Sequence, residues 1–137
     1  RIVETRKSKA IETPAELAKL VEKAVPKKFH SRRIHPATRI FLALRIKVND
    51  ELGVLRELLD KSVAALNPGG RMVFISYHSL EDRIVKWKFR EYAALPENDF
   101  RIITKKPIIP TDEEIEANPR ARSAKMRVAE KSQGGVE

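Results

Sequence analysis

The sequence of 137 residues contains no cysteine, which excludes a disulfide-stabilised fold of the kind that small secreted domains use. It also has no apolar run near the roughly 18 residues that a membrane-spanning helix needs. The segment from Arg1 to Lys7 is rich in charge and lacks the apolar core of a secretory leader. We therefore expect a cytoplasmic protein with no membrane segment.

Several common functional motifs are missing as well. Glycine occurs only five times, and neither a Walker loop nor a Gly-rich strand-to-helix turn is present. The three histidines, His30, His35 and His78, form no pair at the spacing of metal ligands. We therefore expect no metal site in this chain.

Positive charge is what the sequence does have. Lys and Arg total 28 against 19 Asp and Glu, which gives a formal net charge of +9. A hydrophobic content of 42% beside a charged content of 34% is typical of a globular chain rather than a disordered one. The excess of basic residues indicates a polyanionic partner, with nucleic acid as the first candidate.

Local signals divide the N-terminal part into helices. Thr13 to Glu16 match a capping box with Thr13 as the N-cap, and they predict a helix that Pro26 ends. The basic stretch 27–35 lacks helical periodicity and is expected to be a loop. A second helix is expected to begin at His35-Pro36 and to bend or break at Gly53.

The C-terminal part alternates strands and helices. Met72–Ile75 is a continuous apolar run, typical of a strand buried on both faces of a parallel sheet, and Phe100–Thr104 predicts a second strand. Between them, Ser79 to Asp82 predict a helix that begins at Leu80, with Ser79 as its cap. Thr111 to Glu114 predict a short helix, and residues 120–128 end in the alternation of a strand. This is an α/β pattern, and three strands are too few to bury Met72–Ile75, so we expect the rest of the sheet to precede Arg1.

The segment Ser76-Tyr77-His78-Ser79 follows the predicted buried strand, where ligands of open α/β sheets bind. His78 could donate a hydrogen bond or act as a base, and Tyr77 could stack on a ring. The alternative is that Ser79 only caps the helix, that Asp82 completes the capping box, and that His78 is a polar loop residue. A cap is worth about 1 kcal/mol, which is enough to explain the motif.

Two basic clusters, residues 27–35 and 120–127, could each neutralise several phosphates, although a solvated basic surface is the alternative. Between them, Lys86 to Arg90 interleave aromatic and cationic side chains. At helical spacing Phe89 belongs to the core, and Trp87 either packs or stacks on a base.

Three longer segments resemble hallmark motifs of the bacterial 16S rRNA (cytosine N4)-methyltransferase family. They are Ile34–Leu52, Pro68–Lys86 and Asn118–Arg127, and they occur in the family's order and spacing. Together with Glu12–Leu17, the resemblance covers nearly the whole chain. It implies S-adenosylmethionine-dependent methylation of the exocyclic amine of a cytosine in small-subunit rRNA.

The resemblance also implies a fold, a Rossmann-like class I methyltransferase domain with an α-helical insert. Residues 1–53 would be the later part of the insert, 54–131 the C-terminal part of the methyltransferase domain, and 132–137 a flexible tail. Met72–Ile75 would be a parallel strand, and the last two strands would form a closing antiparallel pair. The family's cofactor loop lies in the N-terminal half, so we expect no cofactor-binding residue here, an inactive isolated chain, and that missing half as a partner.

The resemblance marks the motifs, and the role of each site residue within them is our own inference, since the target base should swing out of its stack into a pocket. His78 and Ser79 are the candidates for catalysis. The candidates for substrate binding are Tyr77, Arg45, Asn49, Arg120, Arg122 and Lys125, the last three as ligands of rRNA phosphates. Two alternatives stay open: a non-enzymatic RNA-binding or ribosome-assembly module, and a structural piece that forms a homodimer.

Overall fold

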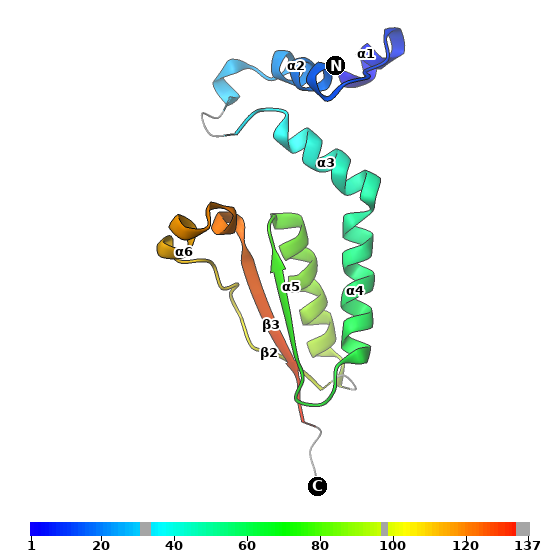
Figure 1. Cartoon of the computed structure of the whole chain (residues 1–137). Coiled ribbons are helices and arrows are strands. Elements are labelled where there is room, and N and C mark those ends of the chain that lie inside the picture. Colours follow the sequence, from blue (N-terminus) through cyan, green and yellow to red (C-terminus); the bar gives the residue numbers. More distant parts are fainter. Residues whose placement is uncertain (31–33, 97–98, 134–137) are drawn as a thin grey trace. The chain divides into compact units, whose positions relative to one another are not determined.

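The computed structural model describes residues 1–30, 34–96 and 99–133 (Figure 1). The chain divides into two compact units, Arg1–Asp50 and Glu51–Glu137. Helices and strands both occur, so the predicted α/β class is confirmed. Among the described residues, no helix is both long and apolar enough to cross a bilayer.

The first unit consists of helices. They are α1 (Ile2–Ser8), α2 (Pro14–Ala24), the short 3-10 helix η1 (Lys27–Phe29) and α3 (Thr38–Asn49). The predicted capping box of α2 is confirmed, because the Glu16 N–H donates to Thr13 Oγ1 at 3.2 Å and the Glu16 carboxylate accepts the Thr13 N–H. Helix α1 has no such signal, since its N-cap Arg1 makes no side-chain cap, and the sequence did not predict it.

The predicted second helix is corrected at both ends. It begins at Thr38 rather than at Pro36, because the Ala37 N–H donates to His35 Nδ1 and closes a turn first. It ends at Asn49 because Asp50 adopts the left-handed conformation at φ 49°, which aspartate tolerates better than most residues. Gly53 lies inside the next helix and breaks nothing. The basic stretch 27–35 was predicted to be a loop, but Lys27–Phe29 form η1; residues 31–33 lie outside the described residues.

The second unit contains a three-stranded sheet and its helices. Helices α4 (Glu51–Ala65) and α5 (Ser79–Ala94) are joined by strand β1 (Arg71–Ser76). Strand β2 (Phe100–Ile102), helix α6 (Asp112–Ala117), the 3-10 helix η3 (Pro119–Ser123) and strand β3 (Lys125–Lys131) follow. The strand order is β1-β3-β2, and both pairs are antiparallel. The predicted antiparallel pair of the last two strands is therefore confirmed.

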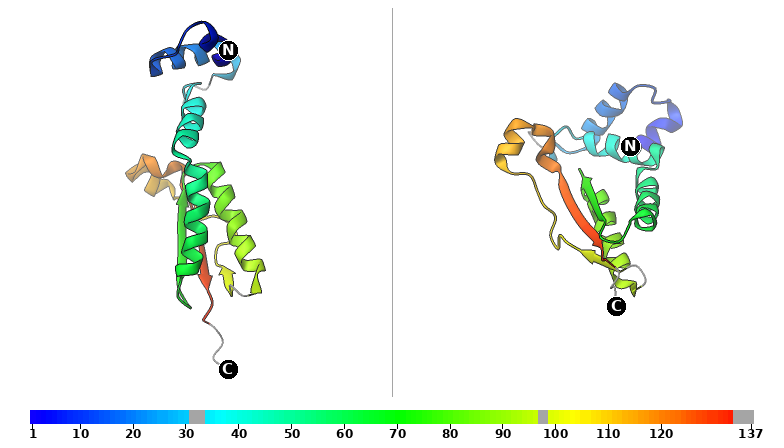
Figure 2. Two further views of the ribbon diagram at one scale, coloured as in Figure 1. Left: turned by 90° about the vertical axis from the view of Figure 1, so that its right-hand side faces the viewer. Right: turned by 60° about the horizontal axis from the view of Figure 1, so that its bottom comes forward.

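One face of the sheet carries the core of this unit. Helices α4 and α5 lie side by side along that face (Figure 2). The core consists of Leu59, Val63, Met72, Val85, Phe89, Tyr92, Phe100 and Ala129. Phe89 lies at its centre, with its ring edge-to-face against Phe74 and Phe100. This packing fixes α5, and therefore the turn that precedes it.

The apolar run of strand β1 predicted burial on both faces of the sheet, and this prediction was wrong. Met72 and Ser76 are buried, whereas Val73 is 52% and Ile75 is 56% exposed. Within the part of the chain that the structure describes, β1 pairs only with β3, and antiparallel, so the predicted parallel pairing has no counterpart here. The reason is that helices cover a single face, which leaves alternate side chains of β1 on the outside.

Candidate functional site

The turn between β1 and α5 holds the residues that the sequence singled out, and a capping box sets its geometry. The Glu81 N–H donates to His78 Nδ1 at 3.3 Å. In return, Glu81 Oε2 accepts the N–H groups of Tyr77 at 2.9 Å and of His78 at 3.3 Å. The predicted cap was therefore wrong by one residue. The helix begins at Ser79, with His78 and Glu81 in the places assigned to Ser79 and Asp82.

This cap decides the chemistry that His78 can offer. Because Nδ1 accepts a backbone N–H, the neutral imidazole carries its proton on Nε2. That Nε2 atom is buried without a hydrogen-bond partner, and it lies 3.4 Å from Glu81 Oε1. In this arrangement His78 holds the turn through Nδ1, and its Nε2–H group donates to no acceptor among the described residues. Because the Nδ1 lone pair already accepts the Glu81 N–H, the geometry disfavours action of His78 as a base, one of the two options that the sequence left open.

Asp82 has a role that the sequence did not predict. The Arg127 guanidinium donates two hydrogen bonds to the Asp82 carboxylate, from Nε at 2.7 Å and from Nη2 at 3.2 Å. Both side chains are largely buried, and Lys125 Nζ lies 3.9 Å from the same carboxylate. The bond from Arg127 is the largest cause of the lowered pKa of Asp82, and the charges of Lys125 and Lys86 add to it. Asp82 therefore remains ionised and ties the first turn of α5 to β3.

The structure brings some of the predicted site residues together. Lys125 lies directly opposite Ser76 in the β1–β3 register, so it sits beside the turn formed by Tyr77, His78 and Ser79. Tyr77 and Ser79 are both exposed. A ring, a hydroxyl and an ammonium group are thus available at one end of the sheet, and this set can contact a base and a phosphate.

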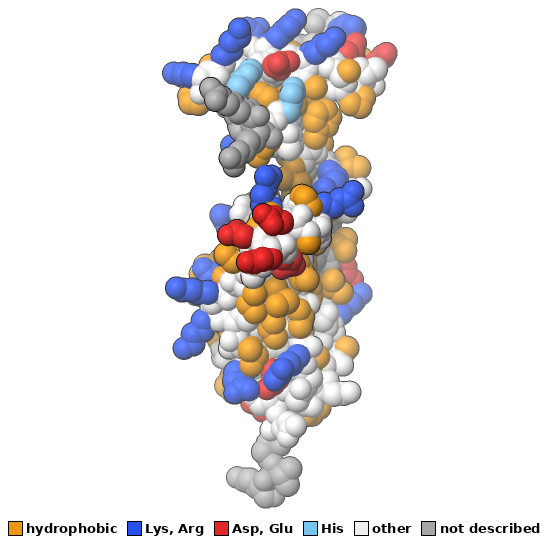
Figure 3. All heavy atoms as spheres, turned by 60° about the vertical axis from the view of Figure 1, so that its left-hand side comes forward, with side chains coloured by type: hydrophobic (Ala, Val, Ile, Leu, Met, Phe, Trp, Pro, Cys, Tyr) orange, Lys and Arg blue, Asp and Glu red, His pale blue; other side chains and the backbone are white. Residues whose placement is uncertain are grey.

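The other predicted residues lie elsewhere. Arg120 and Arg122 are exposed on η3, which packs against the acidic helix α6. Figure 3 shows acidic side chains gathered over α6. Part of the positive charge of the basic cluster 120–127 therefore lies near negative charge. Arg45 and Asn49 are exposed one helical turn apart on α3, as their spacing predicted, but α3 belongs to the other unit.

Sequence reasoning missed Glu81 and Arg127. Glu81 could have been found, because it follows His78 by three residues, the spacing of a capping box, but histidine is not among the usual cap residues. Arg127 left no local signal, because it is 45 residues from Asp82 in the chain. Only the antiparallel pairing of β1 with β3 brings the two together.

His78 and Glu81, together with Glu51 at the start of α4, form the only group of metal-ligand type found among the described residues. Glu51, His78 and Glu81 each place one ligand-type atom within 4.8 Å of the other two. The capping box already occupies Glu81 Oε2 and His78 Nδ1 with three backbone N–H groups. Hydrogen bonding therefore accounts for this cluster without an ion.

The described glycines do not form a cofactor cradle. Gly69, at φ +75°, and Gly70 make the turn from α4 into β1, where their N–H groups donate to Lys131 O and Asn67 O. A side chain at Gly70 would meet the Asn67 carbonyl at 2.8 Å, so the glycine serves a tight turn. Gly53 lies inside α4. These three glycines therefore serve a turn and a helix rather than a phosphate- or cofactor-binding loop.

Comparison with known proteins places this chain in a family. Residues 1–132 match the model of the MraW methylase family. A relative from Clostridioides difficile named ribosomal RNA small subunit methyltransferase H is 50% identical and aligns with 95% of this chain and 46% of its own length. Relatives of the same name from Leptospira interrogans and Nostoc sp. are both 53% identical over 96% of this chain, and over 39% and 41% of their own lengths.

This chain thus spans less than half the length of these curated relatives. The match nevertheless runs through every helix and strand described above, including the turn between β1 and α5. The resemblance seen in the sequence is confirmed: the chain belongs to the MraW methylase family.

Proposed function

We propose that this chain is the C-terminal part of an enzyme that methylates the exocyclic amine N4 of a cytosine in small-subunit rRNA. The observation that carries the proposal is the family match over residues 1–132, together with relatives named ribosomal RNA small subunit methyltransferase H. S-adenosylmethionine supplies the methyl group in this proposal. Its binding residues lie outside this chain, and the isolated chain is inactive.

The sheet supports the view that a larger domain is present in the whole enzyme. Strand β1 exposes Val73 and Ile75 on one face, and its outer edge meets no described strand. A Rossmann-like methyltransferase sheet would continue at this edge with parallel strands and cover the exposed face with helices. We assign α1 to α3 to the helical insert and the sheet-containing unit to the methyltransferase domain, in a cytoplasmic protein.

The turn between β1 and α5 is the place where this chain would meet the target base. Cytosine N4 is a poor nucleophile, because its lone pair is delocalised into the ring, so the amine must be aimed closely. The exposed Ser79 hydroxyl accepts a hydrogen bond from the N4 amine, and the Tyr77 ring stacks on the flipped base. Lys125, beside the turn, holds a neighbouring phosphate, and Arg120 and Arg122 hold phosphates further along the strand. Arg45 and Asn49 add contacts from the insert.

His78 has a different part in this proposal. Its Nδ1 atom holds the turn, and its Nε2 atom is buried, so it positions Tyr77 and Ser79 rather than touching the base. Replacement by alanine removes a cap worth about 1 kcal/mol, and we expect a several-fold loss of kcat. Asparagine is among the best cap residues, so His78→Asn should recover most of the loss. A kcat that stays low in His78→Asn would instead give the Nε2–H group a direct role.

The test uses the full-length enzyme, labelled S-adenosylmethionine and small ribosomal subunits, followed by digestion of the RNA to nucleosides. We expect the label in N4-methylcytidine, and Ser79→Ala should lower kcat more than it weakens RNA binding. The Ser132→Ala variant, remote from the turn, is the matched control. RNA binding without any methyl transfer would favour a non-enzymatic ribosome-assembly role, and label in another nucleoside would overturn the cytosine N4 assignment.

A further inference from the structure

Helix α5 presents the chain's single tryptophan to solvent. Trp87 is 57% exposed, while its neighbours Val85 and Phe89 are almost completely buried in the core. The helix is therefore anchored through its inner face, and Trp87 is not one of the residues of that core. An aromatic ring held out on a rigid helix is a suitable surface for stacking.

Cationic groups surround this ring. Lys86 Nζ lies 5.7 Å and the Arg90 guanidinium lies 5.2 Å from the ring centroid, both within the range of a cation–π contact. Arg83 is exposed one helical turn earlier. Positions 83, 86, 87 and 90 follow the spacing of a single helix face. We call these four residues, Arg83, Lys86, Trp87 and Arg90, the α5 basic face.

The cations of this face have no salt-bridge partner among the described residues of the unit. Lys88, on the same helix, pairs with Asp60 at 2.8 Å and with Glu91 at 3.2 Å. Arg83, Lys86 and Arg90 form no salt bridge with any acidic side chain in the described ranges 1–30, 34–96 and 99–133. Asp82, the acidic group whose charge interacts with Lys86, is already bound by Arg127. The face is thus a positive surface around an aromatic ring.

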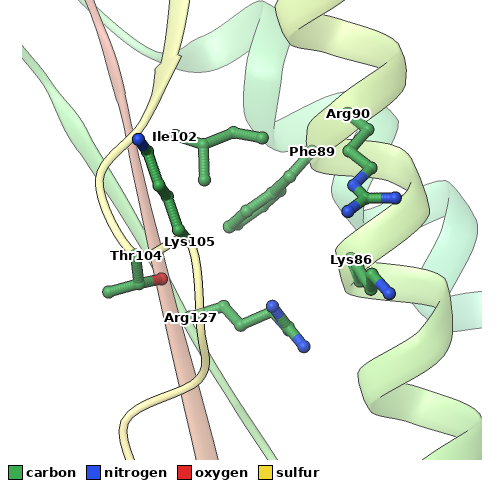
Figure 4. Close-up of a pocket in the computed structure, with 7 residues that line it drawn as sticks. All are labelled: Lys86, Phe89, Arg90, Ile102, Thr104, Lys105 and Arg127. Atoms are coloured by element: carbon green, nitrogen blue, oxygen red, sulfur yellow. The ribbon is translucent and has the colours of Figure 1, made fainter.

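A cavity of about 330 Å³ adjoins the face between α5 and the segment after β2 (Figure 4). Phe89 and Ile102 form its apolar wall, while Thr104 and Lys105 lie across from α5. Lys86 and Arg90 line it too, so these two side chains serve both the ring and the cavity. Lys105 extends the positive surface from α5 to the strand side.

We propose that the α5 basic face binds single-stranded RNA, with one base stacked on Trp87 and the flanking phosphates held by Arg83, Lys86 and Arg90. Lys105 at the cavity binds the next phosphate. The proposal rests on the proposed function, to which it adds a second contact for the same RNA. Trp87 is eight residues beyond Ser79, about 12 Å along the helix, so a strand whose target base lies at the turn can reach both.

The single tryptophan gives a direct test in the 137-residue chain. Its fluorescence is titrated with a single-stranded oligocytidylate of about a dozen nucleotides, while the anisotropy of the same oligonucleotide, end-labelled, reports total binding. We expect quenching of Trp87 that follows the anisotropy curve, because a stacked base quenches indole emission. Binding by anisotropy without a change in Trp87 emission would overturn the proposal.

Substitutions separate stacking from charge. Trp87→Ala should raise the Kd by about 5- to 150-fold, the range for loss of one stacked base, and Trp87→Phe should lie between. The triple change of Arg83, Lys86 and Arg90 to Gln should reduce the slope of log K against log salt by about 2. Lys61→Gln, a charge removal on the exposed side of α4, is the control. A change under twofold in Trp87→Ala, with circular dichroism unchanged, would contradict the stacking role.

Kinetic measurements on the full-length enzyme can separate RNA binding at the α5 basic face from the proposed methyl transfer. With small ribosomal subunits as substrate, Trp87→Ala should raise KM with little change in kcat, because the face is remote from the turn. If the parent enzyme methylates rRNA but Trp87→Ala leaves KM unchanged, the inference fails and the proposed function stands. If no methyl transfer occurs but RNA quenches Trp87, the proposed enzyme function fails and RNA binding at α5 stands.

Discussion

The two units of this chain differ in what holds them together. Of the eleven hydrophobic side chains that the described residues bury, nine lie in the unit after Asp50, and only Val21 and Ala37 lie before it. The second unit also contains ion pairs that join distant parts of the chain, such as Asp82 with Arg127 and Glu130 with Arg101. In the first unit, the capping box of α2 and the Lys9–Glu16 pair are local.

This difference decides which positions can tolerate change. In the second unit, the core side chains contact residues that are far apart in sequence. This core supports the turn at His78 and the α5 basic face. In the first unit, short-range hydrogen bonds define the helices, and each one contributes about 1 kcal/mol or less. Substitutions in the second unit should therefore have the larger effects on stability, and the following experiments test that expectation.

The largest effect is expected from Phe89→Ala. Phe89 is 1% exposed and contacts two other aromatic rings, so its removal leaves a cavity that costs about 3–5 kcal/mol of unfolding free energy. Denaturant unfolding followed by Trp87 fluorescence measures the loss. The control is Phe29→Ala, where the ring is 68% exposed and the loss should stay below about 0.5 kcal/mol. Similar losses in both variants would remove the distinction between the units.

A somewhat smaller loss is expected from Arg127→Met, which leaves the Asp82 carboxylate largely buried without its principal partner. Breaking a buried ion pair from one side costs about 3 kcal/mol or slightly more, and Lys125 at 3.9 Å offsets part of this. Denaturant unfolding at neutral pH gives the loss. The double variant Asp82→Asn with Arg127→Met should lose less than the single one, and an equal loss would show that the charge of Asp82 is not the cause.

The Asp82–Arg127 pair should also affect how the unfolding free energy changes in acid. Because Arg127 lowers the pKa of Asp82 in the folded state, the pair stabilises the fold fully above the carboxyl's unfolded pKa of about 3.9. That stabilisation is lost as the pH falls from there through the folded-state pKa. Asp82→Asn should therefore show a flatter decline in unfolding free energy below about pH 4 than the parent chain. An unchanged decline would mean that other carboxylates dominate acid unfolding.

The boundary between local and distant interactions also explains what the sequence could predict. The caps at Thr13 and Thr111 were predicted correctly, because the capping residue and its N–H donor are three positions apart. The second helix was predicted to bend or break at Gly53, whereas α3 ends at Asn49 and the left-handed residue is Asp50. Helical periodicity does not show which of several neighbouring residues adopts the left-handed conformation. The antiparallel neighbour of β1 and the Asp82–Arg127 pair depend on segments about fifty residues apart, which no local pattern encodes.

The candidate site follows the same division. Its place at Ser76 to Ser79 could be predicted, because a buried strand followed by a capped helix marks the ligand-binding edge of an α/β sheet. The tautomer of His78 could not, because it depends on which residue caps α5. The grouping of Lys125 with Tyr77 and Ser79 depends on strand register. The alternation of aromatic and cationic residues around Trp87 was visible in the sequence, but the packing of the core around Phe89 decides whether the Trp87 ring faces inward or outward.

The smallest effect is expected from Thr13→Ala. The substitution removes the acceptor of the Glu16 N–H, and a lost cap of this kind costs about 1 kcal/mol. Hydrogen exchange of the first-turn amides of α2 should accelerate about fivefold, while those of α5 stay unchanged. Thr111→Ala is the matched control, because Thr111 Oγ1 accepts the Glu114 N–H at the same distance of 3.2 Å in the other unit. If Thr13→Ala lowered the unfolding free energy reported by Trp87 as much as Phe89→Ala does, the first unit would depend on more than local hydrogen bonds.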